Sequence, residues 1–301
     1  MKKGLAILVV MAIISSCFVA NAVSGEDSAV EWSGGFIVVG TRLVDYVGDG
    51  GDVVIPDGIT AIYNYVFADY VNITSITIPD SVTHIGAYMV NGCTALVSLN
   101  IGNGISNIDK SWFWDCPSLA EINVRSSHAN YSSLSGVLFN KNKTELIWYP
   151  EGKQNVSYCI PSSVKTISNN AFLRCKAIKS VSIPNSVVEI GFSAFWGCES
   201  LDFLRISSNV TTIRGGAFDE VTILSVFENS YAHNWAVENG HSYEVLSFSE
   251  VKELRDVLVL MLFIVNNVEL SDEQVGAADL HEDGKIDAKD VLEALKMIVV
   301  R

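Results

Sequence analysis

The chain has 301 residues, of which 49% are apolar and only 18% are charged, and its formal net charge is −14. This apolar content can offset the conformational entropy lost on folding, so the composition excludes a disordered protein. The excess of carboxylates argues against a nucleic acid as the partner, because phosphate binding needs clustered cations. A protein, a carbohydrate or a cation stays open as the ligand.

Residues 1–22 have the pattern of a secretory signal peptide. Two lysines precede an apolar run from Leu5 to Ala20, and Ala20-Asn21-Ala22 supplies a small-residue cleavage site. Two alternatives stay open: a retained membrane anchor, for which the run is short, and lipoprotein processing that would lipidate Cys17. We expect an exported protein whose mature chain has a net charge of −16 after the loss of two lysines.

The body of the chain is an internal repeat. Its anchors are Ile-Pro or equivalent pairs, separated by steps of 23, 23, 59, 23 and 23 residues: Ile55, Ile78, Ile101, Ile160, Ile183 and Ile206. Apolar residues recur four, seven, twelve and eighteen positions after each anchor, as in Val187, Ile190, Phe195 and Leu201. A fixed period in the low twenties is the length of a leucine-rich repeat and predicts a solenoid.

Stacking explains why the columns exist, since one turn alone cannot bury its apolar residues. The segment before each anchor alternates in polarity, as in Leu96–Ile101, which predicts short parallel strands spaced about 4.8 Å apart. We therefore predict a mainly β solenoid over residues 23–246, with short helical or 3-10 turns. The 59-residue step indicates an insertion at about 125–159.

Four cysteines follow the same register, fifteen residues after their anchors: Cys93, Cys116, Cys175 and Cys198. Tyr70 and Val221 occupy this column in the outer turns. We expect a ladder of buried thiols rather than disulfides or a metal site, because free cysteine is among the most buried residue types. Cys159 precedes its anchor and should face outward, either as a tolerated small residue or as a reactive thiol.

These motifs resemble the BspA-like leucine-rich repeat family of bacterial surface proteins. The family's pattern is present as Ile183-Pro184, Val187, Ile190, Ala194-Phe195, Cys198 and Leu201. The resemblance covers about residues 35–246. It implies a first turn around Leu43–Tyr46, a hairpin insertion that contains Gly136–Phe139, and a closing short helix near Ser230–Gly240. It also implies a binding scaffold for adhesion and protein recognition.

The strand side chains that point outward are the candidate recognition face, although an ordinary solvated ladder is the alternative. They are Ser75, Thr77, Ser98, Asn100, Glu121, Asn123, Ser180, Ser182, Phe203 and Arg205. Most are small and polar.

The repeat stops near residue 247, and a calcium-loop pattern follows. Positions 1, 5, 9 and 12 of an EF-hand-type loop are carboxylates, with a turn glycine at 6, which suits a cation that needs convergent hard oxygens. The expected site comprises Asp279, His281, Asp283, the Lys285 carbonyl, Asp287 and Asp290. An acidic turn that caps the next helix is the alternative. His281 is a poor calcium ligand, and we expect one Ca²⁺.

Aspartate at position 12 before an apolar helix resembles the loop of a dockerin, a module that docks into cohesin domains. The helix repeats 34 residues earlier at Arg255–Leu258, but the loop before it lacks ligands, so residues 247–301 resemble a partly degenerate, small α-helical dockerin domain. The resemblance places cohesin contacts at Leu254, Arg255, Ala288 and Lys289. The apolar run Val257–Val265 is a core face or a partner surface.

The sequence shows no catalytic pattern among its five histidines. We therefore predict a secreted, non-enzymatic binding protein that a calcium-dependent module attaches to a cohesin-bearing, cellulosome-like scaffold. The alternative is a free or lipid-anchored adhesin whose degenerate module only closes the solenoid. An enzyme would require a concentrated acidic cleft on the solenoid.

Overall fold

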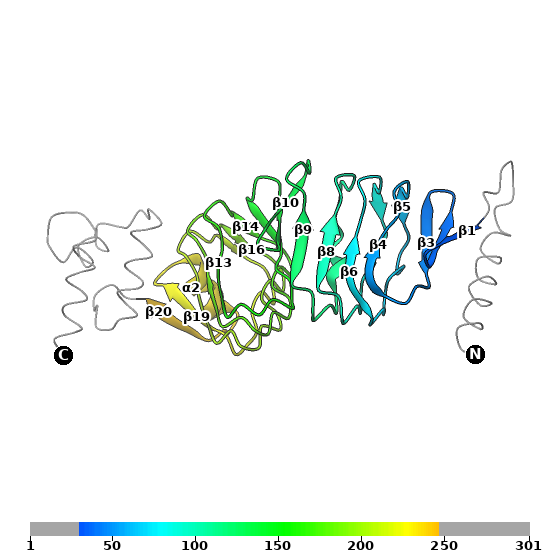
Figure 1. Cartoon of the computed structure of the whole chain (residues 1–301). Coiled ribbons are helices and arrows are strands. Elements are labelled where there is room, and N and C mark those ends of the chain that lie inside the picture. The colour runs from blue at the N-terminus through cyan, green and yellow to red at the C-terminus, as the bar shows by residue number, and fades with distance from the viewer. Residues whose placement is uncertain (1–29, 247–301) are drawn as a thin grey trace, which may run out of the picture.

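A computed structural model describes residues 30–246. Within them the chain forms an elongated coil, whose first strands lie at the right and whose last strands lie at the left in Figure 1. The first strands are β1 Val30–Ser33, β2 Phe36–Val39, β3 Arg42–Tyr46, β4 Gly51–Val54, β5 Ala61–Ile62, β6 Ile73–Thr77, β7 His84–Ile85, β8 Ser98–Ile101 and β9 Glu121–Val124. The later strands are β10 Tyr131–Leu134, β11 Val137–Asn140, β12 Glu145–Trp148, β13 Ser157–Cys159, β14 Thr166–Ile167, β15 Ser180–Ser182, β16 Glu189–Ile190, β17 Phe203–Arg205, β18 Thr212–Ile213, β19 Ile223–Phe227 and β20 Tyr243–Leu246. The helices are the 3-10 helix η1 Lys110–Phe113 and the α-helix α2 Tyr231–Glu238.

The fold is the predicted β solenoid, with about nine turns. One side of the coil carries parallel strands just before each anchor, in the orders β4-β6-β8-β9, β13-β15 and β17-β19-β20. Most of these pairings join residues 23 positions apart, such as Ser75 with Ser98, so the sequence period is the hydrogen-bond register. Another side carries the parallel orders β3-β5-β7 and β12-β14-β16-β18, in which every strand after the first has only two residues.

The apolar columns form the core as predicted. Every anchor isoleucine is buried, and so are the residues four, twelve and eighteen positions later. In the column seven positions later, only Ile85 is half-buried. Val221 is a correction, because its side chain is 68% exposed. In this last turn β17 and β19 pair residues 20 positions apart, such as Leu204 with Leu224, instead of 23, so Val221 does not lie in the column of the cysteines.

Aromatic rings stack along the core of the second half. Phe172 and Phe195 lie 4.8 Å apart between ring centroids, and Phe195 and Phe218 lie 5.8 Å apart, both nearly parallel. Tyr149 continues the stack at 4.9 Å from Phe172. Successive turns thus bury identical side chains against one another, which is how a short repeat builds a continuous core.

Two positions in the loops of the repeat adopt the left-handed backbone conformation. The first lies ten residues after the anchor, as in Tyr88 at φ 57° and Asn170 at φ 60°. The second lies fourteen residues after it, as in Gly92 at φ 74° and Asp115 at φ 55°. Only glycine takes this conformation without a steric penalty. Each non-glycine residue at these positions therefore stores backbone strain in the turn.

The insertion is a three-stranded element rather than a loop. Strands β10 and β11 form an antiparallel hairpin, β11 pairs antiparallel with β12, and β12 pairs in parallel with β14. The insertion therefore contributes a strand to the short-strand sheet of the solenoid. Lys141 holds the hairpin to the preceding turn, since its Nζ donates to the carbonyls of Ser126 at 2.8 Å and His128 at 2.5 Å.

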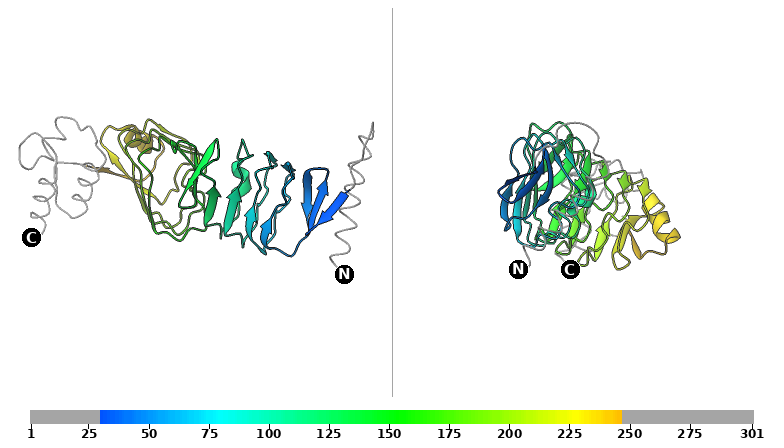
Figure 2. Two further views of the ribbon diagram at one scale, coloured as in Figure 1. Left: turned by 45° about the horizontal axis from the view of Figure 1, so that its top comes forward. Right: turned by 90° about the vertical axis from the view of Figure 1, so that its right-hand side faces the viewer.

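This insertion divides the hydrophobic core into two clusters. Leu138 and Trp148 belong to the first cluster, which the turns before the insertion form. Phe139 and Tyr149 belong to the second, which the later turns form. Adjacent strand residues point to opposite faces. One face of the insertion therefore packs in the first cluster and the other face packs in the second. In the end-on view of Figure 2, the last turns lie to one side of the first ones.

Both ends of the described coil are closed. Antiparallel strands β1, β2 and β3 cover the first turn, and β20 pairs with β19 at the other end. Helix α2 lies over the last turn and buries Ala232 and Ala236, while the Ser230 hydroxyl caps it by accepting from His233 N at 3.1 Å. The expected first turn and closing helix are thus confirmed. Among residues 30–246, no helix is long and apolar enough to cross a bilayer.

Candidate functional site: the outward strand face

The predicted recognition residues all lie on the outer side of the long-strand sheets. Each is half-exposed or exposed, and it alternates along its strand with a buried core residue, as Ser75 and Thr77 do with Ile76. Their outward orientation is therefore as expected from the alternation. Their role in recognition stays a prediction.

In the first half of the coil these side chains form a hydrogen-bonded ladder. The Asn123 amide donates to Asn100 Oδ1 at 3.2 Å, and the Asn100 amide donates to Thr77 Oγ1 at 3.2 Å. The Asn123 amide also approaches Glu121 Oε2 at 3.4 Å. The contacts fix the rotamers of the amides, so a ligand would meet a preorganised row of donors and acceptors.

Sequence reasoning missed the strand that begins this face. Asp52 on β4 accepts from Ser75 Oγ at 2.7 Å and from Thr74 Oγ1 at 3.0 Å. These hydrogen bonds lower the pKa of the Asp52 carboxyl. Val54, two residues later, exposes its side chain beside Thr77. The signal was present, because both residues hold the outward positions before the Ile55 anchor.

The second half presents a different surface. On β13 and β15 the outward residues are small, including Ser180 and Ser182. On β17 they are large: Phe203 pairs with Ile223, and the Arg205 guanidinium lies 5.4 Å from the Phe227 ring centroid. Burial lowers the pKa of Arg205 to about 10. Ile223 also belongs to this exposed area and was not predicted, because the last turn shortens its register.

The strand face is not continuous. Strands β9 and β13 belong to different sheets, and the hairpin stands between them. The insertion covers the outer edge of β9. Ile122 N donates to the Gly136 carbonyl at 3.0 Å, and Val124 N donates to Ser133 Oγ at 3.0 Å. The sequence predicted an insertion here, but not that it separates the face into two.

The cysteine ladder has the predicted form. Cys93, Cys116, Cys175 and Cys198 are buried free thiols, and Cys159 is exposed. The Cys93 thiol donates to the Phe67 carbonyl at 2.9 Å, and the Cys198 thiol donates to the Phe172 carbonyl at 3.1 Å. Burial raises the pKa of both thiols to about 12. These sulfurs therefore act as small core residues with a weak donor.

Two glutamates lie in a polar depression of about 240 Å³ beside the short strands β14 and β16. Glu189 Oε1 accepts from both Nε and Nη2 of Arg214 at 2.8 Å, and Glu145 accepts from the Ser168 hydroxyl. Arg214 and Lys110 balance the two carboxylates within the depression. The arrangement is an ion-pair network that joins the neighbouring turns. Across residues 30–246, no three His, Cys, Asp or Glu side chains cluster as metal ligands.

Several predicted features lie outside the described residues. They are the signal peptide with Cys17, the calcium loop from Asp279 to Asp290, the apolar run Val257–Val265 and the expected cohesin contacts at Leu254, Arg255, Ala288 and Lys289.

Comparison with known proteins matches the repeat. A family model described as "BspA type Leucine rich repeat region" matches in six copies, over residues 51–159 and 151–234. No curated protein matches the chain.

Among the solved structures that are similar to this chain are three of bacterial proteins. A leucine-rich repeat protein from Eubacterium ventriosum is 23% identical, with a TM-score of 0.44 over 68% of this chain and 73% of that one. The pneumococcal vaccine antigen PcpA is 16% identical, with a TM-score of 0.40 over 69% and 77%. A leucine-rich cell surface protein from Faecalibacterium prausnitzii is 18% identical, with a TM-score of 0.35 over 67% and 89%.

Proposed function

Since the chain belongs to the BspA-type leucine-rich repeat family, we propose that it is a non-enzymatic binding protein of the cell surface. The observation that carries this proposal is an ordered row across successive strands, in which the Asn123 amide donates to Asn100 Oδ1 and the Asn100 amide donates to the Thr77 hydroxyl. Such a row offers planar donors and acceptors at a spacing of about 4.8 Å. An extended segment of a partner protein could pair with them.

The test is binding of the purified chain to a panel of immobilised extracellular proteins. Asn100→Lys and Asn123→Lys place long charged side chains on the row without touching the core. Thr211→Lys is the matched control, because Thr211 is exposed on a different side of the coil. We expect the two asparagine variants to weaken binding at least tenfold and the control to bind like the wild type. Equal binding by all three variants would refute this face as the recognition surface.

The proposal has a second part, which concerns attachment. We propose that residues 247–301 dock the solenoid to a cohesin domain through one Ca²⁺. The support is the sequence pattern of Asp279, Asp283, Asp287 and Asp290, which spaces carboxylates as a calcium loop does. The same loop accounts for part of the acidity, because residues 250–301 contain twelve acids and six bases.

Calorimetric titration of the full chain with Ca²⁺, followed by a panel of cohesin domains, tests attachment. Asp283→Ala should abolish calcium uptake, whereas Asp272→Ala, which lies outside the loop, should not. Docking is excluded if the wild type binds calcium but no cohesin. It is also excluded if the wild type binds neither calcium nor cohesin. The alternative, a free or lipid-anchored adhesin, then remains, and the mass of the mature N-terminus shows whether Cys17 carries a lipid.

A further inference from the structure

A second depression lies on the loop side of the coil, where the turn before the hairpin meets the turns after it. It has a volume of about 210 Å³, and no residue that lines it belongs to a strand. The residues that matter here are Trp114, Asp115, Asn170, Arg174, Ser193 and Trp196. This site is separate from the outward strand face, so it goes beyond the proposed function.

Two indole rings line this depression from opposite sides of the insertion. The side chain of Trp114 is 39% exposed and that of Trp196 is 46% exposed. The same protein buries Trp112 and Trp148 fully. Leaving a tryptophan in water forgoes a large hydrophobic stabilisation. Two such rings beside one hollow indicate a surface that a ligand covers.

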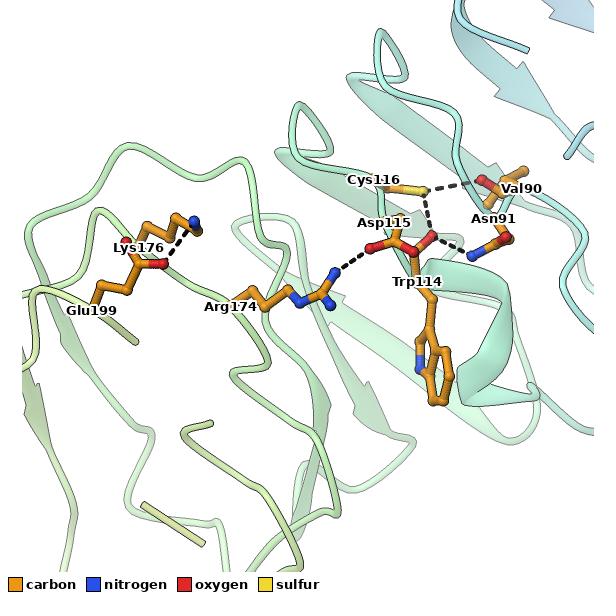
Figure 3. Close-up of polar contacts among 8 residues, drawn as sticks. All are labelled: Val90, Asn91, Trp114, Asp115, Cys116, Arg174, Lys176 and Glu199. Carbon is orange, nitrogen blue, oxygen red and sulfur yellow. Dashed lines mark hydrogen bonds and ion pairs between the residues drawn. The ribbon is translucent and has the colours of Figure 1, made fainter. Parts of the chain in front are cut away.

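An ion pair joins the two sides. Arg174 donates from Nη1 to Asp115 Oδ1, and its guanidinium lies 5.7 Å from the ring centroid of Trp196. Figure 3 shows Arg174 reaching across to Asp115, with the Trp114 indole beside the pair. Although these residues are 59 positions apart, they hold the same position in their repeats. The register of the solenoid therefore creates the site.

Hydrogen-bonding capacity is left over around this ion pair. Within residues 30–246, Asp115 Oδ2, Arg174 Nε and Nη2, the Asn170 amide and the Ser193 hydroxyl have no hydrogen-bond partner. Each of these groups can still donate to or accept from a ligand. A few convergent polar groups beside apolar walls are the usual composition of a small-molecule site.

Backbone conformation shows how the repeat places these residues. Asp115, Asn170, Arg174 and Ser193 all have positive φ angles, between 50° and 60°. In other turns the same repeat positions are glycine, as at Gly92. Tyr65, Asp69 and Tyr88 have the same conformation in earlier turns, so the repeat itself places the four polar residues at the rim of the depression.

We propose that this depression binds one neutral sugar ring of a glycan. The apolar C–H face of a pyranose fits against an indole ring, and its hydroxyls match carboxylate, guanidinium, amide and hydroxyl groups around the rim. The lining charges of Asp115 and Arg174 cancel, which favours an uncharged ligand over an anion or a cation. The volume admits a single ring rather than a chain.

Saturation-transfer NMR and calorimetry on the full chain test this site, with the methyl glycosides of glucose, galactose, mannose and N-acetylglucosamine as probes. At least one should bind with a dissociation constant in the millimolar range. Trp196→Ala and Asp115→Asn should each weaken that binding at least tenfold. Tyr63→Ala removes an exposed aromatic ring away from the depression and should change binding less than twofold.

Three outcomes would overturn the proposal. One is that none of the four glycosides binds below about 20 mM. Another is that binding persists unchanged in the Trp114→Ala, Trp196→Ala double variant. The third is that the anionic N-acetylneuraminic acid binds more tightly than every neutral probe. Circular dichroism of each variant shows whether it is folded, and Asp115→Asn keeps the size of the side chain in case the alanine variants do not fold.

Discussion

The buried cysteines show what a repeat column requires of one residue. Each must be small enough to fit against its copy in the next turn, and its polar atom must find a carbonyl inside the coil. The Cys116 thiol does so by donating to the Val90 carbonyl at 3.1 Å. Cys159 has neither constraint, because it lies outside on β13.

This difference predicts selective alkylation. In native protein at pH 8, iodoacetamide should modify Cys159 but leave Cys93, Cys116, Cys175 and Cys198 unmodified, because burial raises the pKa of those thiols and shields them. In 6 M guanidinium all of them should react. Peptide mass mapping reads each site separately. Rapid native modification of Cys175 would contradict the ladder.

His128 gives a pH prediction with a definite sign. Its ring is buried, and Nδ1 accepts from the backbone N–H groups of Asn130 at 3.1 Å and Tyr131 at 3.2 Å. Burial, and secondarily the charge of Lys141, lowers its pKa. Below about pH 6.5 the unfolded chain takes up a proton that the native ring resists, so the native state loses stability as the pH falls. Above that pH the contribution is complete.

The Tm of the wild type should therefore drop more steeply between pH 7 and pH 5 than that of His128→Gln, which cannot titrate. Differential scanning calorimetry measures both slopes, and their difference removes the contribution of the carboxylates that the two proteins share. Equal slopes would show that His128 is not the group responsible.

At the scale of elements, the stacked phenylalanines make each turn depend on its neighbours. Phe195→Ala removes the middle ring of the stack and should destabilise the protein by about 3–5 kcal/mol. Phe192→Ala is the matched control, because that ring is 54% exposed three residues away and its removal should cost no more than about 0.5 kcal/mol. Urea denaturation gives both values. A comparable loss in the two variants would contradict the assignment of the core column.

Most of the solenoid could be predicted from the sequence because the same pattern of apolar residues recurs in every turn. Six copies of each column place Ile183, Val187 and Phe195 in the core more securely than one copy would. The outward orientation of Asn100 followed from alternation alone. The prediction for Val221 was wrong because the last turn pairs β17 with β19 over 20 positions instead of 23, a shortening that the anchor spacing does not show.

The depression between Trp114 and Trp196 could not be predicted in the same way. Trp114 and Trp196 occupy the same place in a Phe-Trp-x-Cys segment, so the repeat puts both on the loop side of the coil, but their turns are separated by the 59-residue step. Their meeting depends on how the insertion completes a turn, and that is set by the pairing of β12 with β14. The length of an insertion in a sequence does not reveal which of its strands will join a sheet.

At the scale of the whole molecule, the insertion divides the hydrophobic core of the solenoid into two clusters. On one side, the ring centroids of Trp148 and Phe113 lie 5.2 Å apart. On the other side, those of Tyr149 and Phe172 lie 4.9 Å apart. In a repeat protein, a cavity lowers the local stability mainly of the adjacent turns. The two neighbouring residues should therefore affect different halves.

Hydrogen exchange measured by mass spectrometry tests this division. Trp148→Ala should accelerate amide exchange mainly in β8 and β9, and Tyr149→Ala mainly in β14 and β16. Each variant serves as the control for the other. Uniform acceleration along the whole coil in both variants would show that the insertion does not separate the cores.

The interruption of the strand face also changes what the protein can do as a binder. Two short faces of different chemistry, one rich in amides and one with Phe203 and Arg205, are carried on one rigid coil at a fixed separation. If both faces bind as proposed, such an arrangement is bivalent. A partner that displays both matching epitopes would gain from high effective concentration at the second contact, whereas a partner with only one epitope would not. Avidity, rather than the affinity of either face alone, would then decide which surfaces this protein holds.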